Sequence, residues 1–252
     1  MRLIDLRLAA AAVCMLVATS SFSNPFLMQG SWFAGASIGL QNPHLDGYYT
    51  INNGSGFSPP GNMDSYSTQM DSTGVVSFDG GYRWQQDTAW IPAYALGLRY
   101  SHSFDTDIGR KITLFSLPDF TNYTYKWDIA SDIFLLTAKI NLFQWHHILP
   151  FLSGGAGVTF NTASNYQETA LPGVTPRISP AFGRNTTSQF AYNLGVGVDW
   201  QVKPQWLVTL DYEYQNLGKV SSSSGVGTWA GSSLRSGTYH TGTVSLGFVY
   251  LI

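Results

Sequence analysis

The chain has 252 residues, a formal net charge of −2, 11% charged residues and 15% aromatic residues. Soluble domains carry about 25% charged residues, so this chain has too few charges for an ordinary soluble surface. Its weak net charge and its lack of any run of lysine or arginine exclude nucleic-acid binding. The longest charge-free apolar stretch, residues 8–17, is shorter than the roughly 18 residues that a membrane-spanning helix needs. A closed β-barrel is the other structure that satisfies every backbone group inside lipid.

The first segment, residues 1–23, has the pattern of a secretion signal. Arg2 and Arg7 form its positive start, an apolar core follows, and small residues stand where a signal peptidase cuts. We therefore expect export and an outer-membrane β-barrel domain over residues 24–252. Cys14 is the single cysteine and lies inside the signal, so the mature chain would have no disulfide.

Eight segments alternate apolar residues with small or polar ones, at the period of two that a β-strand produces. In chain order they are residues 31–40, 74–84, 91–104, 123–142, 150–160, 189–200, 206–216 and 238–252. Their connections are long and short in turn, at about 33, 6, 18, 7, 28, 5 and 21 residues. This asymmetry is typical of outer-membrane barrels, whose extracellular loops are long and whose periplasmic turns are short.

The pattern predicts an all-β fold: an eight-stranded antiparallel transmembrane β-barrel, built as an up-and-down meander with four long extracellular loops. We expect it in the cell outer membrane of a Gram-negative bacterium. A water-soluble β-sandwich would also alternate, but it would expose charges on the face that is not apolar. Here that face consists mostly of glycine, serine, alanine and asparagine.

One segment, residues 123–142, changes its pattern halfway. Phe134 and the apolar residues after it point outward, whereas Tyr125, Trp127 and Ile129 have the opposite phase. Two interpretations remain open. Either a one-residue bulge near residues 131–133 restores the phase, or the upper half of the strand projects above the membrane.

Aromatic residues gather near the two rims of the predicted barrel, as expected at membrane interfaces. Those assigned to the periplasmic rim are Trp32, Trp84, Tyr94, Trp200, Trp206 and Tyr250.

Seven ionisable residues point inward by the same phase and would form a charge network in the lumen. They are Asp79, Arg83, Arg99, Lys139, Asp199, Asp211 and Glu213. Pairing Trp84 with Pro92 across the turn places Asp79 diagonal to Arg99. The network either plugs the lumen or lines a path for protons or ions. Eight strands leave an interior just wide enough for side chains, which favours the plug.

Two stretches carry a family resemblance. Residues 190–220 read FAYNLGVGVDWQVKPQWLVTLDYEYQNLGKV, with a G-x-G strand, a short turn with proline, and Y-x-Y followed by Leu-Gly. They resemble the final hairpin of the small opacity-like and OmpA/OmpX-like outer-membrane barrels, and the C-terminal TGTVSLGFVYLI resembles the family's terminal assembly strand. The family usually ends in phenylalanine, whereas this chain ends in Ile252. The resemblance implies an assembly signal at Phe248, Tyr250 and Ile252, read by the barrel-assembly machinery, and a surface role.

An enzymatic site is not expected. Residues 99–104 resemble a strand of the lipid A deacylases, which carries a histidine and, two residues later, a catalytic serine, but Phe104 occupies that position. His102 and Ser103 are adjacent and so face opposite sides of a strand. We also expect no cofactor and no metal site, because His44 and His240 are isolated in the sequence.

The predicted loops hold aromatic residues among many serines, threonines, asparagines and glycines. These are Tyr48, Tyr49, Phe57, Tyr66, Phe120, Tyr166, Phe182 and Trp229. Such mixtures suit adaptable contact with a host or environmental protein or glycan, or they form a solvated shield.

We predict an integral outer-membrane protein with a structural and surface-interaction role in envelope integrity, adhesion or host contact. A narrow channel for ions or small solutes is the alternative, and an outer-membrane lipid-modifying enzyme is a distant one.

Overall fold

The computed structural model describes residues 29–46 and 49–252. The predicted signal, residues 1–23, and Tyr48 lie outside the described residues. The strands are β1 (Gln29–Leu45), β2 (Tyr49–Asn52), β3 (Met63–Tyr66), β4 (Thr73–Gln85), β5 (Trp90–Thr113), β6 (Thr121–Phe143), β7 (Ile148–Ala170), β8 (Asn185–Lys203), β9 (Trp206–Ser224) and β10 (Ser233–Leu251). Three single-turn 3-10 helices, η1 (Leu114–Ser116), η2 (Pro118–Phe120) and η3 (Gly227–Trp229), lie in the loops. Within the described ranges, no helix is both long enough and apolar enough to cross a membrane.

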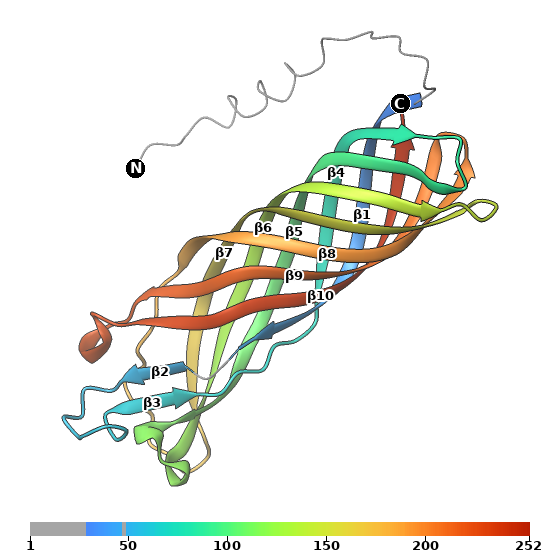
Figure 1. Cartoon of the computed structure of the whole chain (residues 1–252). Coiled ribbons are helices and arrows are strands. Elements are labelled where there is room, and N and C mark those ends of the chain that lie inside the picture. The colour runs from blue at the N-terminus through green and yellow to red at the C-terminus, as the bar shows by residue number, and fades with distance from the viewer. Residues whose placement is uncertain (1–28, 47–48) are drawn as a thin grey trace.

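Eight of these strands close into a ring in the order β1-β4-β5-β6-β7-β8-β9-β10, with every pair antiparallel and β10 joined back to β1 (Figure 1). The predicted eight-stranded antiparallel meander is confirmed. The remaining two strands, β2 and β3, form a hairpin inside the first long loop and pair with the far end of β5. The sequence did not predict this hairpin, because its strands are only four residues long.

The strands extend well beyond the predicted segments at the end that carries the long loops. β5, β6 and β7 contain 24, 23 and 23 residues, whereas a tilted membrane strand needs about 9 to 11. About half of each therefore lies outside the membrane. We call the part built on residues 106–113, 121–130 and 161–170, with the strand ends that pair with them, the extracellular half. The rest is the membrane half.

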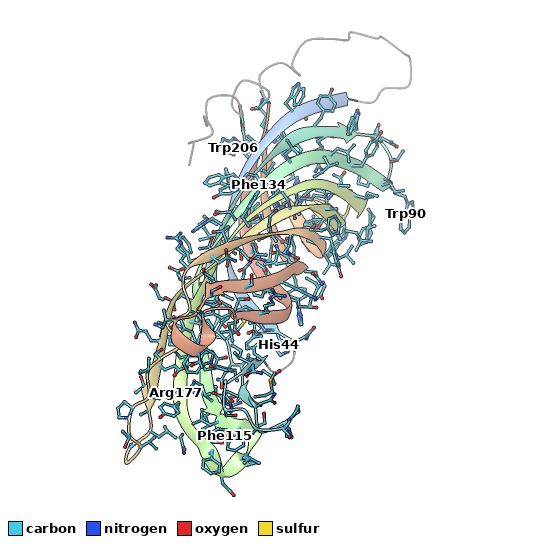
Figure 2. All side chains as sticks on the ribbon, turned by 90° about the vertical axis from the view of Figure 1, so that its left-hand side faces the viewer. His44, Trp90, Phe115, Phe134, Arg177 and Trp206 are labelled. Atoms are coloured by element: carbon cyan, nitrogen blue, oxygen red, sulfur yellow. The ribbon has the colours of Figure 1, made fainter. Side chains whose placement is uncertain are left out.

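Large apolar side chains face outward all round the membrane half. Without a membrane they would be exposed to water. They include Ile38, Leu40, Phe78, Leu96, Leu98, Phe134, Leu136, Leu194, Val196, Leu210, Val244 and Leu246. Such a band is stable only against lipid. The six predicted rim aromatics stand at the ends of strands near the short turns, and the Trp206 ring packs 4.5 Å from that of Tyr250 and 4.7 Å from that of Phe248. Figure 2 shows Trp206 at this end of the molecule and Phe115 at the opposite tip.

The polarity of the barrel inverts in the extracellular half. There the inward side chains form an apolar core, because water replaces lipid outside the wall. The core includes Tyr66, Ile108, Ile112, Tyr123, Tyr125, Trp127, Ile129, Tyr166, Leu217, Val220, Trp229, Leu234 and Tyr239. Outward positions, such as Lys126 and Thr169, are exposed and polar.

Of the two interpretations of residues 123–142, the one with a bulge near residues 131–133 of β6 is wrong. Odd-numbered residues of β6 point inward along its whole length, so its phase never changes. The register shifts lie on its two neighbours instead, between Ser103 and Thr106 of β5 and opposite residues 126–128 on β7. What changes along β6 is the chemistry of its inward side chains, in agreement with the alternative that its upper half projects above the membrane.

The predicted register of the first short turn is also wrong, by two residues. Trp84 pairs with Tyr94 and not with Pro92, so Asp79 stands directly opposite Arg99. The backbone at Ile91 adopts a left-handed conformation, with φ of 53°. This bend keeps the first residues of β5 out of the ladder with β4.

The outward face of the membrane half gives a direct test of the lipid boundary. Val196 lies in the middle of β8 and is 52% exposed, and an arginine at the bilayer midplane costs about 2 to 4 kcal/mol. We expect Val196→Arg to lower the free energy of unfolding in lipid by this amount. Thr169→Arg, also outward on a strand but in the extracellular half, should be nearly neutral. Equal losses in urea titrations of the two variants would show that the two halves meet the same solvent.

Candidate functional site in the lumen and the extracellular head

The lumen of the membrane half is crossed by ion pairs between opposite walls. In a ring of eight strands β5 and β9 stand opposite each other, and the guanidinium of Arg99 on β5 forms a hydrogen-bonded ion pair with Glu213 on β9. Asp79 Oδ1 lies 3.6 Å from Arg99 Nη2. Arg99 therefore has two carboxylate partners, one beside it and one across the barrel.

The carboxylate of Glu213 is almost fully buried, and neutral donors hold its other oxygen. Asn193 Nδ2 and Gln215 Nε2 each donate to Glu213 Oε2 at 3.1 Å. A buried charge is tolerated only when it is paired and hydrogen-bonded in this way. The ion pair with Arg99 is thus fixed from both sides.

A second cluster surrounds Asp199, whose side chain is fully buried. Lys139 Nζ donates to Asp199 Oδ1 at 2.6 Å, and Arg83 Nη1 lies 3.7 Å from Oδ2. Asn141 Nδ2 at 3.0 Å and Thr209 Oγ1 at 2.8 Å complete the donors. Arg83 comes from β4, which stands opposite β8 in the ring, so this cluster also ties two facing walls.

Little free space remains between the two clusters. The ammonium of Lys139 lies 3.9 Å from the centre of the Phe151 ring. A cavity of about 60 Å³, with room for a few water molecules, is lined in part by Phe33, Asp79 and Asp211. Asp211 Oδ2 has no hydrogen-bond partner among the described residues. The seven inward ionisable residues are three cations and four carboxylates, and Asp211 is the carboxylate that the clusters leave over.

In the extracellular half, one carboxylate connects three loops. Asp64 on β3 is 1% exposed and accepts hydrogen bonds from Asn53 Nδ2 at 3.0 Å and from the backbone N–H of Phe115 at 3.1 Å. Its other oxygen accepts from Arg177 Nη1 at 2.7 Å. The first, second and third loops therefore meet at this side chain. We call the residues it joins, with the core beneath them, the extracellular head.

Arg177 extends this connection to β7. Its Nε and Nη2 donate to the two oxygens of Glu168 at 3.0 Å each, a bidentate ion pair. Burial alone would lower the pKa of Arg177, but its hydrogen bonds and attraction to Glu168 and Asp64 outweigh burial and raise that pKa above its usual range. Tyr166 also donates to Glu168, and burial, with Tyr66 and Glu168 nearby, raises the pKa of Tyr166. Sequence patterns alone did not reveal this cluster, because its members lie in segments that resemble separate loops.

Most of the loop aromatics are not available for contact with a partner. Tyr49, Tyr66, Tyr166, Phe182 and Trp229 are buried in the extracellular head. Only two of the described ones are exposed, Phe57 at 62% and Phe120 at 43%. These five aromatics therefore cannot take part in the loop contact that the sequence suggested, whereas contact through the exposed two stays a prediction. Residues 121–130 carry a signal of this buried core, because their alternation of polar and large apolar residues is that of a strand in a water-soluble barrel.

The sequence suggested that His44 and His240 are isolated from each other, but the structure brings them together. They stand directly opposite each other on β1 and β10, with Asp46 near both. On β5, His102 points outward and its Nδ1 lies 2.8 Å from Asp132 Oδ1, whereas Ser103 points inward and donates to Gln41 Oε1 at 2.6 Å. The histidine and the adjacent serine therefore lie on opposite faces of the wall.

The comparisons with known proteins agree with the ring of strands. The family model of the outer membrane protein beta-barrel domain matches residues 8–250, and the chain belongs to this family. It is an integral protein of the outer membrane of a Gram-negative bacterium. No curated protein sequence matches the chain significantly.

Three of the solved structures that are similar to the chain are the following. OprG from Pseudomonas aeruginosa is 13% identical, with 89% of this chain and 97% of that chain covered and a TM-score of 0.47. Neisserial surface protein A is 11% identical, with 89% and 99% covered and a TM-score of 0.44. The outer membrane protease OmpT from Escherichia coli is 10% identical, with 93% and 100% covered and a TM-score of 0.41. The three names describe different proteins, and similarity at this level assigns no activity.

The ion pair across the lumen predicts a characteristic response to mutation. Removing one partner leaves a buried charge unpaired, at a cost of about 3 to 5 kcal/mol, whereas removing both is much milder. We expect Arg99→Met and Glu213→Gln each to lower the free energy of unfolding in lipid by this amount. The double variant should recover part of the loss, because Glu213 is then neutral while Asp79 still lacks its neighbouring cation. A water-filled lumen would screen both charges. Small additive effects in urea titrations, together with conducting steps in single-channel recordings, would therefore contradict the plug.

The extracellular head predicts a local effect. Arg177→Met leaves the buried carboxylates of Asp64 and Glu168 without their cation, which costs about 3 kcal/mol. We expect faster amide hydrogen exchange in β2, β3 and residues 114–120, with unchanged exchange in the membrane half. The exposed Arg184 on the same loop provides the matched control, and Arg184→Met should change neither region. Uniformly faster exchange in Arg177→Met would show that the head does not unfold as a separate unit.

Proposed function

We propose that this protein stabilises the outer membrane as a plugged barrel and presents a rigid extracellular head for contact with a protein or glycan outside the cell. The observation that carries the proposal is the exposed aromatic tip of the head. Phe115 packs edge to face against Phe57 at 5.8 Å and against Phe120 at 5.7 Å, measured between ring centres. Leu117 beside them is 47% exposed. Clustered, exposed aromatic side chains are the usual anchors of protein contacts.

The tip is held in a fixed shape, which supports a role in recognition. Phe115 and Ser116 both have left-handed backbone conformations, with φ of 56° and 53°. Such conformations cost energy and persist where the surroundings enforce them. Here Asp64 accepts from the N–H of Phe115, and Ser116 Oγ donates to Met63 O at 3.0 Å. A preorganised surface loses less entropy on binding.

The proposal includes two partners inside the envelope. Outer-membrane lipid would contact the apolar band, and the barrel-assembly machinery would read β10 during insertion. Phe248, Tyr250 and Ile252 stand on the outward face of the closing strand region, and Ile252 donates its backbone N–H to Trp32 O at 2.8 Å. This arrangement supports their assignment as an assembly signal.

A non-enzymatic role is also part of the proposal. Catalysis by a hydroxyl nucleophile needs a base within hydrogen-bond reach, and the wall of the barrel separates His102 from Ser103. A narrow channel is the alternative function. It would require the ion pairs of Arg99 and Asp199 and the core of the extracellular head to open together, and the small volume of the cavity between the pairs supports the plug.

The tip can be tested without disturbing the barrel. We expect the double variant Phe57→Ser, Phe120→Ser to weaken binding to extracellular-matrix proteins or glycans by at least about 30-fold, since one aromatic anchor contributes about 2 kcal/mol. Binding is measured with the protein in lipid nanodiscs on protein and glycan arrays. Ile178→Ser provides the control, because Ile178 is 80% exposed on another loop. Unchanged binding in the double variant would remove the tip from the proposal.

A further inference from the structure

A cluster of two histidines and one aspartate lies on the outside of the barrel, at the seam between its first and last strands. His44 on β1 and His240 on β10 are paired in register, and their ring centres are 5.0 Å apart. Asp46 follows His44 by two residues and so points to the same side. Its backbone N–H donates to Thr238 O at 3.0 Å, which fixes Asp46 against β10.

The three side chains converge on one point. Asp46 Oδ1 lies 4.0 Å from His44 Nε2 and 3.9 Å from His240 Nδ1. One ligand atom from each residue lies within 4.8 Å of the other two. Around a tetrahedral zinc ion, with bonds of about 2.0 to 2.1 Å, two ligand atoms stand about 3.3 Å apart. Rotation of side chains can supply this small contraction, since those of His44 and Asp46 are 68% and 57% exposed.

The donor set selects a class of ion. Imidazole nitrogen favours zinc, copper and nickel over magnesium and calcium, and one carboxylate with two histidines is a common set for divalent transition metals. Three protein ligands leave at least one coordination position for water or an outside anion. The site is open to water, because lipid-facing Leu40 and Val244 lie four residues further along β1 and β10, about 13 Å away along the strands.

We propose that His44, Asp46 and His240 bind one divalent transition-metal ion of the zinc class across the seam of β1 and β10. The ion connects the two ends of the chain's meander, at the strand pair that closes the barrel. The bound ion would therefore stabilise the pairing of β1 with β10 from the outer surface of the barrel. The proposal does not depend on the aromatic tip or on the plug.

The site is tested by titrating the refolded protein in detergent with Zn²⁺ and measuring the heat of binding by isothermal titration calorimetry. We expect one Zn²⁺ per chain. His44→Gln, Asp46→Asn and His240→Gln should each lower the affinity at least about tenfold, because even the loss of an outer-shell partner costs 10- to 100-fold. Saturating Zn²⁺ should also raise the urea midpoint of the unmodified protein and not that of the three variants.

Two controls separate this site from ordinary histidine binding. His102→Gln removes an outward imidazole that also has a carboxylate neighbour, Asp132, and His146→Gln with His147→Gln removes the histidines of a periplasmic turn. Both should keep the affinity and the rise in midpoint. Each variant is first shown to unfold in chelator at the midpoint of the unmodified protein. No saturable binding, an affinity that all three ligand variants retain, or an equal loss in the controls would each overturn the proposal.

Discussion

The narrow interior of an eight-stranded ring is the constraint on which the rest of this structure depends. Because opposite walls are within reach of each other's side chains, inward residues find most of their partners inside the protein. In the membrane half the partners are charges, and Arg99 meets Glu213 across the full lumen. In the extracellular half they are apolar side chains such as Trp127. One ring of backbone hydrogen bonds thus holds two interiors of opposite chemistry.

The two interiors follow from what surrounds the wall. Lipid outside requires apolar outward residues and leaves the inward positions to small, polar and charged ones. Water outside requires the reverse, and β6 makes this exchange without any break in its phase. The extracellular half is therefore stabilised as a soluble barrel is, by burial of apolar surface. This arrangement holds the aromatic tip at a fixed height above the membrane, where flexible loops would not.

How much of the structure the sequence predicted depends on whether the residues in contact belong to one strand and its chain neighbours or to distant strands. Alternation with period two identified the ring, its order and the inward phase of residues such as Asp199, because these depend on one strand and its neighbours. Contacts across the lumen or across the closing seam, such as that between His44 and His240, depend on the closed shape. The tie between Asp64 and Arg177 was hidden for another reason: the polar outward residues of the extracellular half made its strands resemble loops.

The hydrogen bonds of Asp64 couple loops that sequence presents as independent. Asn53, Phe115 and Arg177 come from three connections and share one carboxylate. An insertion or deletion in any of these loops would displace a donor and disturb the other two. Surface variation compatible with this fold is therefore restricted to substitutions at outward strand positions and at the tip, while loop length is constrained. A head of this kind can change its chemical identity by point mutation far more readily than its shape.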